Sequence, residues 1–241
     1  MDTGTLNNTN QLAGIGWAEQ VNPRSRVAAG HPLTKEKMAV WTALVSKGIS
    51  NALYGLSLMV HHQMVVTSLS LKWLPVHEAA ATICAPEEKG VGIYLAIEGD
   101  ADGHLLLMHD INMAYKIIDI QLGLPLGTTA HMGDMERSIL GEMGNITGAF
   151  FLNALADATD LSLMPSPPAV MTDLARAMVN LPLSCILEGQ DEALTVNTTF
   201  ATDNHQLDGK FIILPTMDFM NTIIDRQSRT INPELNRYAA V

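Results

Sequence analysis

Residues 102–108 read Asp-Gly-His-Leu-Leu-Leu-Met, and residues 208–214 read Asp-Gly-Lys-Phe-Ile-Ile-Leu. The offset of 106 positions (208 − 102) also aligns Ile117-Ile118-Asp119 with Ile223-Ile224-Asp225. Residues 99–103 (Gly-Asp-Ala-Asp-Gly) are a turn signal, and the apolar run that follows each Asp-Gly pair is typical of a strand. The two stretches therefore predict an internal duplication, in which each copy contains a strand and a following segment that also matches.

In the flanking sequence, stretches with the apolar spacing of a helix alternate with stretches typical of a strand. Thr34 is a candidate N-cap for a long helix, Asp110 caps a shorter one, and Gly123 ends it. The patterns predict helices over 35–60, 111–122, 134–158 (capped by Asp134), 168–180 and 217–226, and strands over 64–73, 92–98, 104–109, 194–201 and 210–214. We predict one pseudo-symmetric α+β domain, with long helices packed on a sheet to which both copies contribute strands.

The domain is expected to span residues 31–227, with repeats at about 34–123 and 134–227. Residues 1–30 show no sustained period and are interpreted as a flexible N-terminal arm, and residues 228–241 as a C-terminal tail. No apolar run is long enough for a membrane span, and the N-terminus does not resemble a signal peptide. We therefore expect a cytoplasmic protein.

The charge balance argues against nucleic-acid binding. The formal net charge is −11, from 14 basic and 25 acidic residues, whereas phosphate binding needs clustered Lys and Arg. The two cysteines lack the spacing of a zinc site, and we expect free thiols. Three other patterns are set aside: His61-His62 as a solvated helix end, His104 and His109 as strand residues rather than ligands, and residues 99–103 as too short for a calcium loop.

The segment 135–156 offers the best candidate for chemistry. Glu142 and Asn145 are three residues apart, so they project from neighbouring positions of a helix. Ile139, Met143, Ile146 and Phe150 have helical spacing and are expected to form its core stripe. Three glycines at 141, 144 and 148 weaken the helix, and we interpret them as a bare surface that a partner protein could approach closely. A Glu and an Asn with this spacing are also compatible with an ordinary solvated face.

This helix resembles the second signature helix of the CheC family of chemotaxis phosphatases, which includes CheX and FliY. The resemblance is carried by Glu142-Met143-Gly144-Asn145-Ile146 with Gly148, and by Leu152-Asn153-Ala154-Leu155. Residues 163–170 (Leu-Met-Pro-Ser-Pro-Pro-Ala-Val) and 91–104 also resemble the family. The similar region runs from about residue 34 to residue 227.

The resemblance implies a phosphatase that hydrolyses the aspartyl phosphate of a CheY-type response regulator. It assigns Asn145 to orienting the attacking water and Glu142 to docking on a lysine of the receiver. It implies no cofactor and no metal on this chain, because the Mg²⁺ belongs to the receiver. Some family members are activated by the deamidase CheD, which makes CheD a candidate partner.

The first long helix departs from the family pattern. Aligning Gly48 on Gly144 (144 − 48 = 96) places Ser46 opposite Glu142 and Ile49 opposite Asn145, so the first site is expected to be lost. Three hypotheses stay open: a phosphatase with one intact site, a catalytically weak or inactive receiver-binding or flagellar-switch-like module, and a plain structural α+β domain. The sequence leaves the identity of the receiver and the oligomeric state undetermined.

Overall fold

A computed structural model describes residues 33–186, 191–202 and 206–231. The predicted arm (1–30) and most of the predicted tail lie outside these residues. The helices are α1 (Lys35–Val60), α2 (Val76–Ile83), α3 (Ile111–Leu122), α4 (Asp134–Thr159), α5 (Ala175–Ile186) and α6 (Met217–Ile231). The strands are β1 (Met64–Pro75), β2 (Lys89–Gly99), β3 (Gly103–Asp110), β4 (Leu163–Pro165), β5 (Ala169–Leu174), β6 (Glu192–Thr202) and β7 (Asp208–Pro215).

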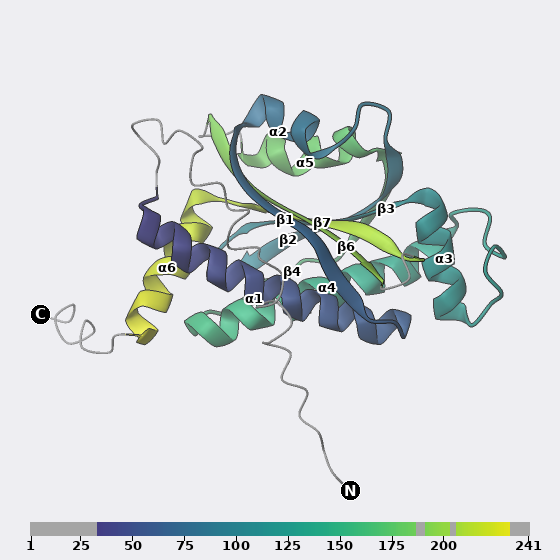
Figure 1. The fold of residues 1–241 in the computed structure, drawn as a ribbon, viewed down its shortest axis with the longest axis horizontal. Helices are drawn as coiled ribbons and strands as arrows, with labels where there is room; N and C mark the ends of the chain where they lie inside the picture. Colours follow the sequence, from purple (N-terminus) through teal and green to yellow (C-terminus); the bar gives the residue numbers. More distant parts are fainter. Residues whose placement is uncertain (1–32, 187–190, 203–205, 232–241) are drawn as a thin grey trace, which may run out of the picture. The chain divides into compact units, whose positions relative to one another are not determined.

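The strands form one antiparallel sheet with helices on both faces, which confirms the predicted α+β class (Figure 1). The strand order is β1-β6-β7-β3-β2-β4, and β5 also pairs with β2. On one face, buried side chains of α1, α3, α4 and α6 share a core with the sheet. On the other face, α2 and α5 cover a smaller core, which includes Met108, Met178 and Ile212.

The two halves of the domain exchange strands across its centre. β1 of the first half pairs with β6 of the second, and β5 of the second half pairs with β2 of the first. At the centre β3 pairs with β7, and Leu106 lies opposite Ile212. The described elements follow the same order in both halves, a long helix followed by strand, helix, two strands and helix, with the first strand of the second half broken into β4 and β5.

Local sequence patterns predicted several helix ends correctly. The side chain of Thr34 accepts a hydrogen bond from the amide of Lys37, and Asp110 accepts one from Asn112. Gly123 ends α3 in the left-handed conformation, with φ of 64°. At α4 the N-cap is Gly133 rather than Asp134, and the Glu136 carboxylate accepts the Gly133 amide proton at 3.0 Å.

The prediction was wrong after Pro168. The expected helix over 168–180 is instead strand β5 followed by α5, because residues 169–174 pair with Lys89–Tyr94 of β2. The short helix α2 was not predicted. Helix α6 continues to Ile231, past the expected end at residue 226 and into the stretch interpreted as a tail.

α1 is long and apolar enough to meet a simple length-and-composition criterion for a membrane span. More than half of the relevant window, 56%, is buried inside the domain, and Trp41 is fully buried against Phe219. This burial is typical of a core helix, and the criterion is weak evidence for a membrane span. His61 and His62, at its C-terminal end, are exposed as predicted.

Candidate functional site

Glu142 and Asn145 lie on the outward side of α4. The Glu142 side chain is exposed and Asn145 is half-buried. A spacing of three residues separates them by about 60° around the helix axis. That rotation moves Asn145 from the centre of the exposed face toward the flank that carries Gly141 and Gly148. Among the described residues, neither side chain has a hydrogen-bond or ion-pair partner, so both are available to a second molecule.

The glycine flank of α4 packs against the protein's own sheet. A Cβ atom on Gly144 would collide with Ile93 of β2, and one on Gly148 would lie 3.2 Å from Leu95 Cδ1. All three glycines are buried. The predicted bare surface for a partner protein is therefore wrong, because the glycines bring α4 close to β2.

Residues 165–168 lie along this flank. A Cβ atom on Gly148 would lie 3.5 Å from Pro165, and one on Gly141 would lie 3.3 Å from Pro168. Gly141 and Gly148 stand on either side of Asn145 along the helix, so this segment passes beside Asn145. We call residues 165–168 the proline wall.

Hydrogen bonds at two points hold the proline wall. The amide of Ser166 donates to the carbonyl of Ala96 at 2.9 Å, and the Ser166 hydroxyl oxygen accepts the amide proton of Ala96 at 2.9 Å. Beyond the wall, in β5, the carbonyl of Val170 accepts a hydrogen bond from the Arg137 guanidinium of α4 at 3.0 Å. The wall is thereby tied to β2, and the strand that continues it is tied to the helix that carries Asn145.

The predicted core stripe of α4 is only partly correct. Met143 is fully buried, whereas Ile139, Ile146 and Phe150 are half-buried. Phe150 contacts α1, where its carbonyl accepts a hydrogen bond from Asn51 and its ring lies 6.0 Å from that of Tyr54. The helix is buried on two sides, against α1 and against the sheet, so one apolar stripe does not describe it.

The two long helices correspond with an offset of 99 residues, not 96. Both are 26 residues long, and each of the ten buried residues of α1 has a buried counterpart 99 positions later in α4. The alignment of Gly48 on Gly144 is therefore wrong. The correct alignment places Ala43 opposite Glu142 and Ser46 opposite Asn145, so α1 still lacks both side chains.

The same alignment shows that α1 lacks the surroundings of the pair as well. Thr42, Val45 and Ile49 stand where α4 has Gly141, Gly144 and Gly148. The counterpart of the proline wall is residues 66–69, Val-Thr-Ser-Leu, within the continuous strand β1. One half of the domain thus contains the whole set, which consists of Glu142, Asn145, the three glycines and the prolines.

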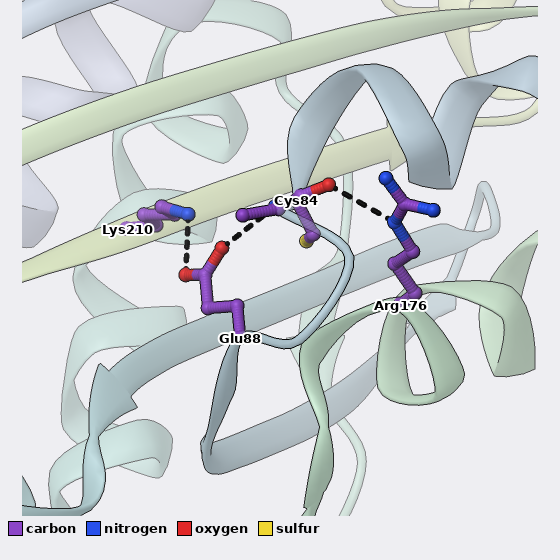
Figure 2. A network of polar contacts seen from close by, with 5 residues as sticks. Cys84, Glu88, Arg176 and Lys210 are labelled. Atoms are coloured by element: carbon purple, nitrogen blue, oxygen red, sulfur yellow. Dashed lines mark hydrogen bonds and ion pairs between the residues drawn. The ribbon is translucent and has the colours of Figure 1, made fainter.

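A second polar cluster lies away from α4, and sequence reasoning missed it. Lys210 Nζ and Glu88 Oε1 lie 2.6 Å apart, and Arg176 Nε donates to the carbonyl of Cys84 at 3.1 Å (Figure 2). Burial raises the pKa of the Cys84 thiol to about 11. Glu88 and Lys210 are 122 residues apart (210 − 88), and no local pattern links them. A cavity of about 350 Å³ adjoins this ion pair, and no residue that lines it belongs to α4.

No group of three or more His, Cys, Asp or Glu side chains could hold a metal ion within the ranges that the structure describes. His109 is buried, and its Nδ1 lies 2.8 Å from the carbonyl oxygen of Asp208, so it donates there. Burial lowers the pKa of His109, partly offset by that carbonyl. His104 is paired with the hydroxyl of Tyr94 at 2.9 Å.

The CheC-like family model matches residues 135–172, the segment that contains Glu142, Asn145 and the proline wall. The chain is also 32% identical over 130 residues to the CheY-P phosphatase CheC of Bacillus subtilis strain 168. The predicted resemblance to the CheC-like family is confirmed. The match to CheC covers 52% of this chain and 62% of the relative's length, so the chain spans less than two thirds of that protein.

Solved structures share the fold at low sequence identity. FliY of Thermotoga maritima superposes with a TM-score of 0.67 and 15% identity, over 83% of this chain and 99% of that chain. The FliM middle domain of H. pylori gives a TM-score of 0.56 and 12% identity, over 80% and 99% of the two chains. At these identities the likeness establishes a shared fold alone.

Proposed function

We propose that this protein is a CheC-like phosphatase that hydrolyses the aspartyl phosphate of a CheY-type response regulator. The observation that carries the proposal is the position of Glu142 and Asn145, both unpartnered among the described residues, on the outward side of α4 within the CheC-like segment. The similarity to a protein named CheY-P phosphatase supports the reaction class. The receiver is the proposed partner, and no role for nucleic acid is proposed.

In the proposed reaction, Asn145 holds the attacking water. An amide side chain both donates and accepts hydrogen bonds, so it can orient a water without removing its proton. The water oxygen attacks phosphorus, the bond from phosphorus to the receiver's aspartate oxygen breaks, and inorganic phosphate and a free carboxylate result. Such transfers depend mainly on positioning and electrostatic stabilisation, which suits a group that is a poor base.

Glu142 is proposed to fix the orientation of the receiver. Its exposed carboxylate stands one helical turn from Asn145 and can pair with an ammonium group of the receiver. In this scheme the receiver holds the Mg²⁺ that neutralises charge on the phosphoryl group, and this chain supplies the water-orienting amide and the docking carboxylate. One such pair per chain predicts one receiver per chain.

The second candidate function is a receiver-binding or flagellar-switch-like module with little or no catalysis. The observation that favours it is the loss of the equivalent pair on α1, where Ala43 and Ser46 stand. The fold shared with FliY and the FliM middle domain fits this alternative. For either function we propose a cytoplasmic location, and CheD remains a proposed partner.

The test measures the decay of several phosphorylated CheY-type receivers with and without this protein. Wild-type protein should accelerate decay of at least one. Glu142→Ala should raise KM about three- to tenfold while kcat changes less, because an exposed charge pair mainly fixes docking. Tight binding of a beryllofluoride-activated receiver without any acceleration would instead establish the second candidate function.

A further inference from the structure

We propose that the proline wall (residues 165–168) positions Asn145, with Ser166 as the residue that locks the wall in place. The inference deepens the proposed function and rests on it for its catalytic part. It assigns a positioning role to residues that touch neither water nor phosphate. The observation behind it is that the wall passes beside the flank of α4 on which Asn145 stands.

The first step is the geometry of the flank. Gly141 and Gly148 lie four residues before and three residues after Asn145. A Cβ atom at either glycine would contact a proline of the wall, so the wall lies against this flank of the helix. Asn145 is half-buried although it lies next to an exposed face. The wall covers the glycine flank next to Asn145, and the face of α4 that carries Glu142 is left exposed for a docking protein.

The second step is the rigidity of the wall. Each proline fixes one backbone dihedral, and three of the four wall residues are prolines. The reciprocal hydrogen bonds between Ser166 and Ala96 anchor the middle of the wall to β2. Because few backbone dihedral angles of the wall are free to change, we infer that the wall restricts the orientations of the neighbouring Asn145 side-chain amide.

The third step is the comparison between the two halves. At the positions equivalent to the wall, β1 continues as an unbroken strand, and Thr67 is the counterpart of Ser166 (166 − 99 = 67). The Thr67 hydroxyl contacts Thr199 Oγ1 at 2.8 Å, so it too makes a hydrogen bond at the same place in the repeat. The half without the Glu and Asn pair also lacks the wall. The wall therefore occurs only in the half that carries the candidate site, although both halves have the same fold.

The experiment compares Ser166→Ala, Ser166→Thr and the matched control Thr67→Ala. Ser166→Ala should lower kcat for receiver dephosphorylation about tenfold, with KM changed less than twofold, because misplacing a positioning group reduces the chemical step. Ser166→Thr keeps the hydroxyl group, so its kcat should stay close to that of the wild-type protein. Thr67→Ala removes the equivalent hydroxyl in the other half and should leave kcat unchanged.

A second readout separates this inference from the proposed function. The side-chain amide signal of Asn145, identified by its absence in Asn145→Ala, should show restricted motion by ¹⁵N relaxation in wild type. Ser166→Ala should increase that motion, and Thr67→Ala should not. Unchanged kcat and unchanged amide motion in Ser166→Ala would overturn the positioning role. If wild-type protein accelerates no receiver, the proposed function fails, and the amide motion alone decides the inference.

Discussion

Asn145 and Ser46 occupy the same position on the two long helices, 99 residues apart, and both are half-buried. Around Asn145 the helix is lined with glycines and flanked by prolines, whereas around Ser46 the equivalent positions hold bulkier residues and a continuous strand. The two long helices thus share one packing pattern, but only α4 carries a candidate site.

This asymmetry predicts that restoring the two side chains does not restore a site. In an Asn145→Ala background, Ala43→Glu with Ser46→Asn recreates the pair on α1 while Thr42, Val45 and Ile49 remain. Receiver dephosphorylation should stay at the level of Asn145→Ala alone. Recovery of more than a small fraction of wild-type activity would show that the pair suffices without the glycine flank and the wall.

Gly144 is predicted to be required for the close approach of α4 to β2. Gly144→Ala would improve intrinsic helix propensity by about 1 kcal/mol, but its Cβ collides with the buried side chain of Ile93. We expect a net loss of about 1–3 kcal/mol in the free energy of unfolding, measured by urea denaturation. In a double-mutant cycle, Ile93→Ala should cost less in the Gly144→Ala background than in wild type, and an additive result would argue against this contact.

Asp119 is predicted to make the stability of the domain pH-dependent. Burial alone would raise its pKa, but hydrogen bonds from the Thr129 hydroxyl and the amides of Thr129, Gly127 and Thr128 outweigh burial and hold the pKa below its usual value. A lowered pKa means that the folded state binds the proton less readily than the unfolded state. The stabilisation is therefore present above about pH 4 and is lost as the pH falls further.

Asp119→Asn should accordingly lower the thermal unfolding midpoint at pH 7 by about 3–8 °C, and the difference from wild type should shrink toward pH 3. The control is Asp225→Asn at the equivalent position of α6. Asp225 makes an exposed ion pair with Lys37 at 3.7 Å, so its removal should have little effect at either pH. A constant difference for Asp119→Asn across this pH range would contradict the assigned role of the carboxylate.

The two thiols are predicted to differ in reactivity. Cys84 is buried, and its pKa is raised to about 11, whereas Cys185 is exposed. At pH 8 the folded protein should incorporate one equivalent of iodoacetamide, because the reactive species is the thiolate. Cys185→Ser should abolish this labelling, and denatured wild type should incorporate two equivalents. Rapid labelling of folded Cys185→Ser would show that Cys84 is accessible.

Sequence patterns predicted helix ends and strands correctly where the signal depends on residues close together in the chain. The caps at Thr34 and Asp110, the stop at Gly123 and the strands at the two Asp-Gly stretches depend on residues that are close together in the sequence, and each was predicted correctly. The Asp208-Gly209 pair itself lies within β7, not in a turn. The helix predicted after Pro168 failed because pairing with β2, some 80 residues earlier in the chain, makes residues 169–174 a strand. A proline marks where a helix can begin, but it equally precedes a strand.

The candidate pair could be read from the sequence, but its surroundings could not. The glycines of α4 indicated a close approach, and only the structure shows that the approaching group is Ile93 of β2, not a partner. The offset between repeats is also not constant. It is 99 between α1 and α4, 103 between β2 and β6, and 106 between α3 and α6. The offset grows because α5 has more residues than α2, and because more residues separate β6 from β7 than β2 from β3. Matching the single pair Gly48 and Gly144 was therefore not enough to align the long helices.

The most direct test of the account follows single-turnover decay of a phosphorylated CheY-type receiver with wild-type protein, Asn145→Ala and the matched variant Ser46→Ala. Wild type and Ser46→Ala should accelerate decay equally. Asn145→Ala should lose about 100-fold of that acceleration while still binding the beryllofluoride-activated receiver, since one oriented polar group is removed. Equal acceleration by wild type and Asn145→Ala would contradict the assignment of Asn145 as the water-orienting residue on α4.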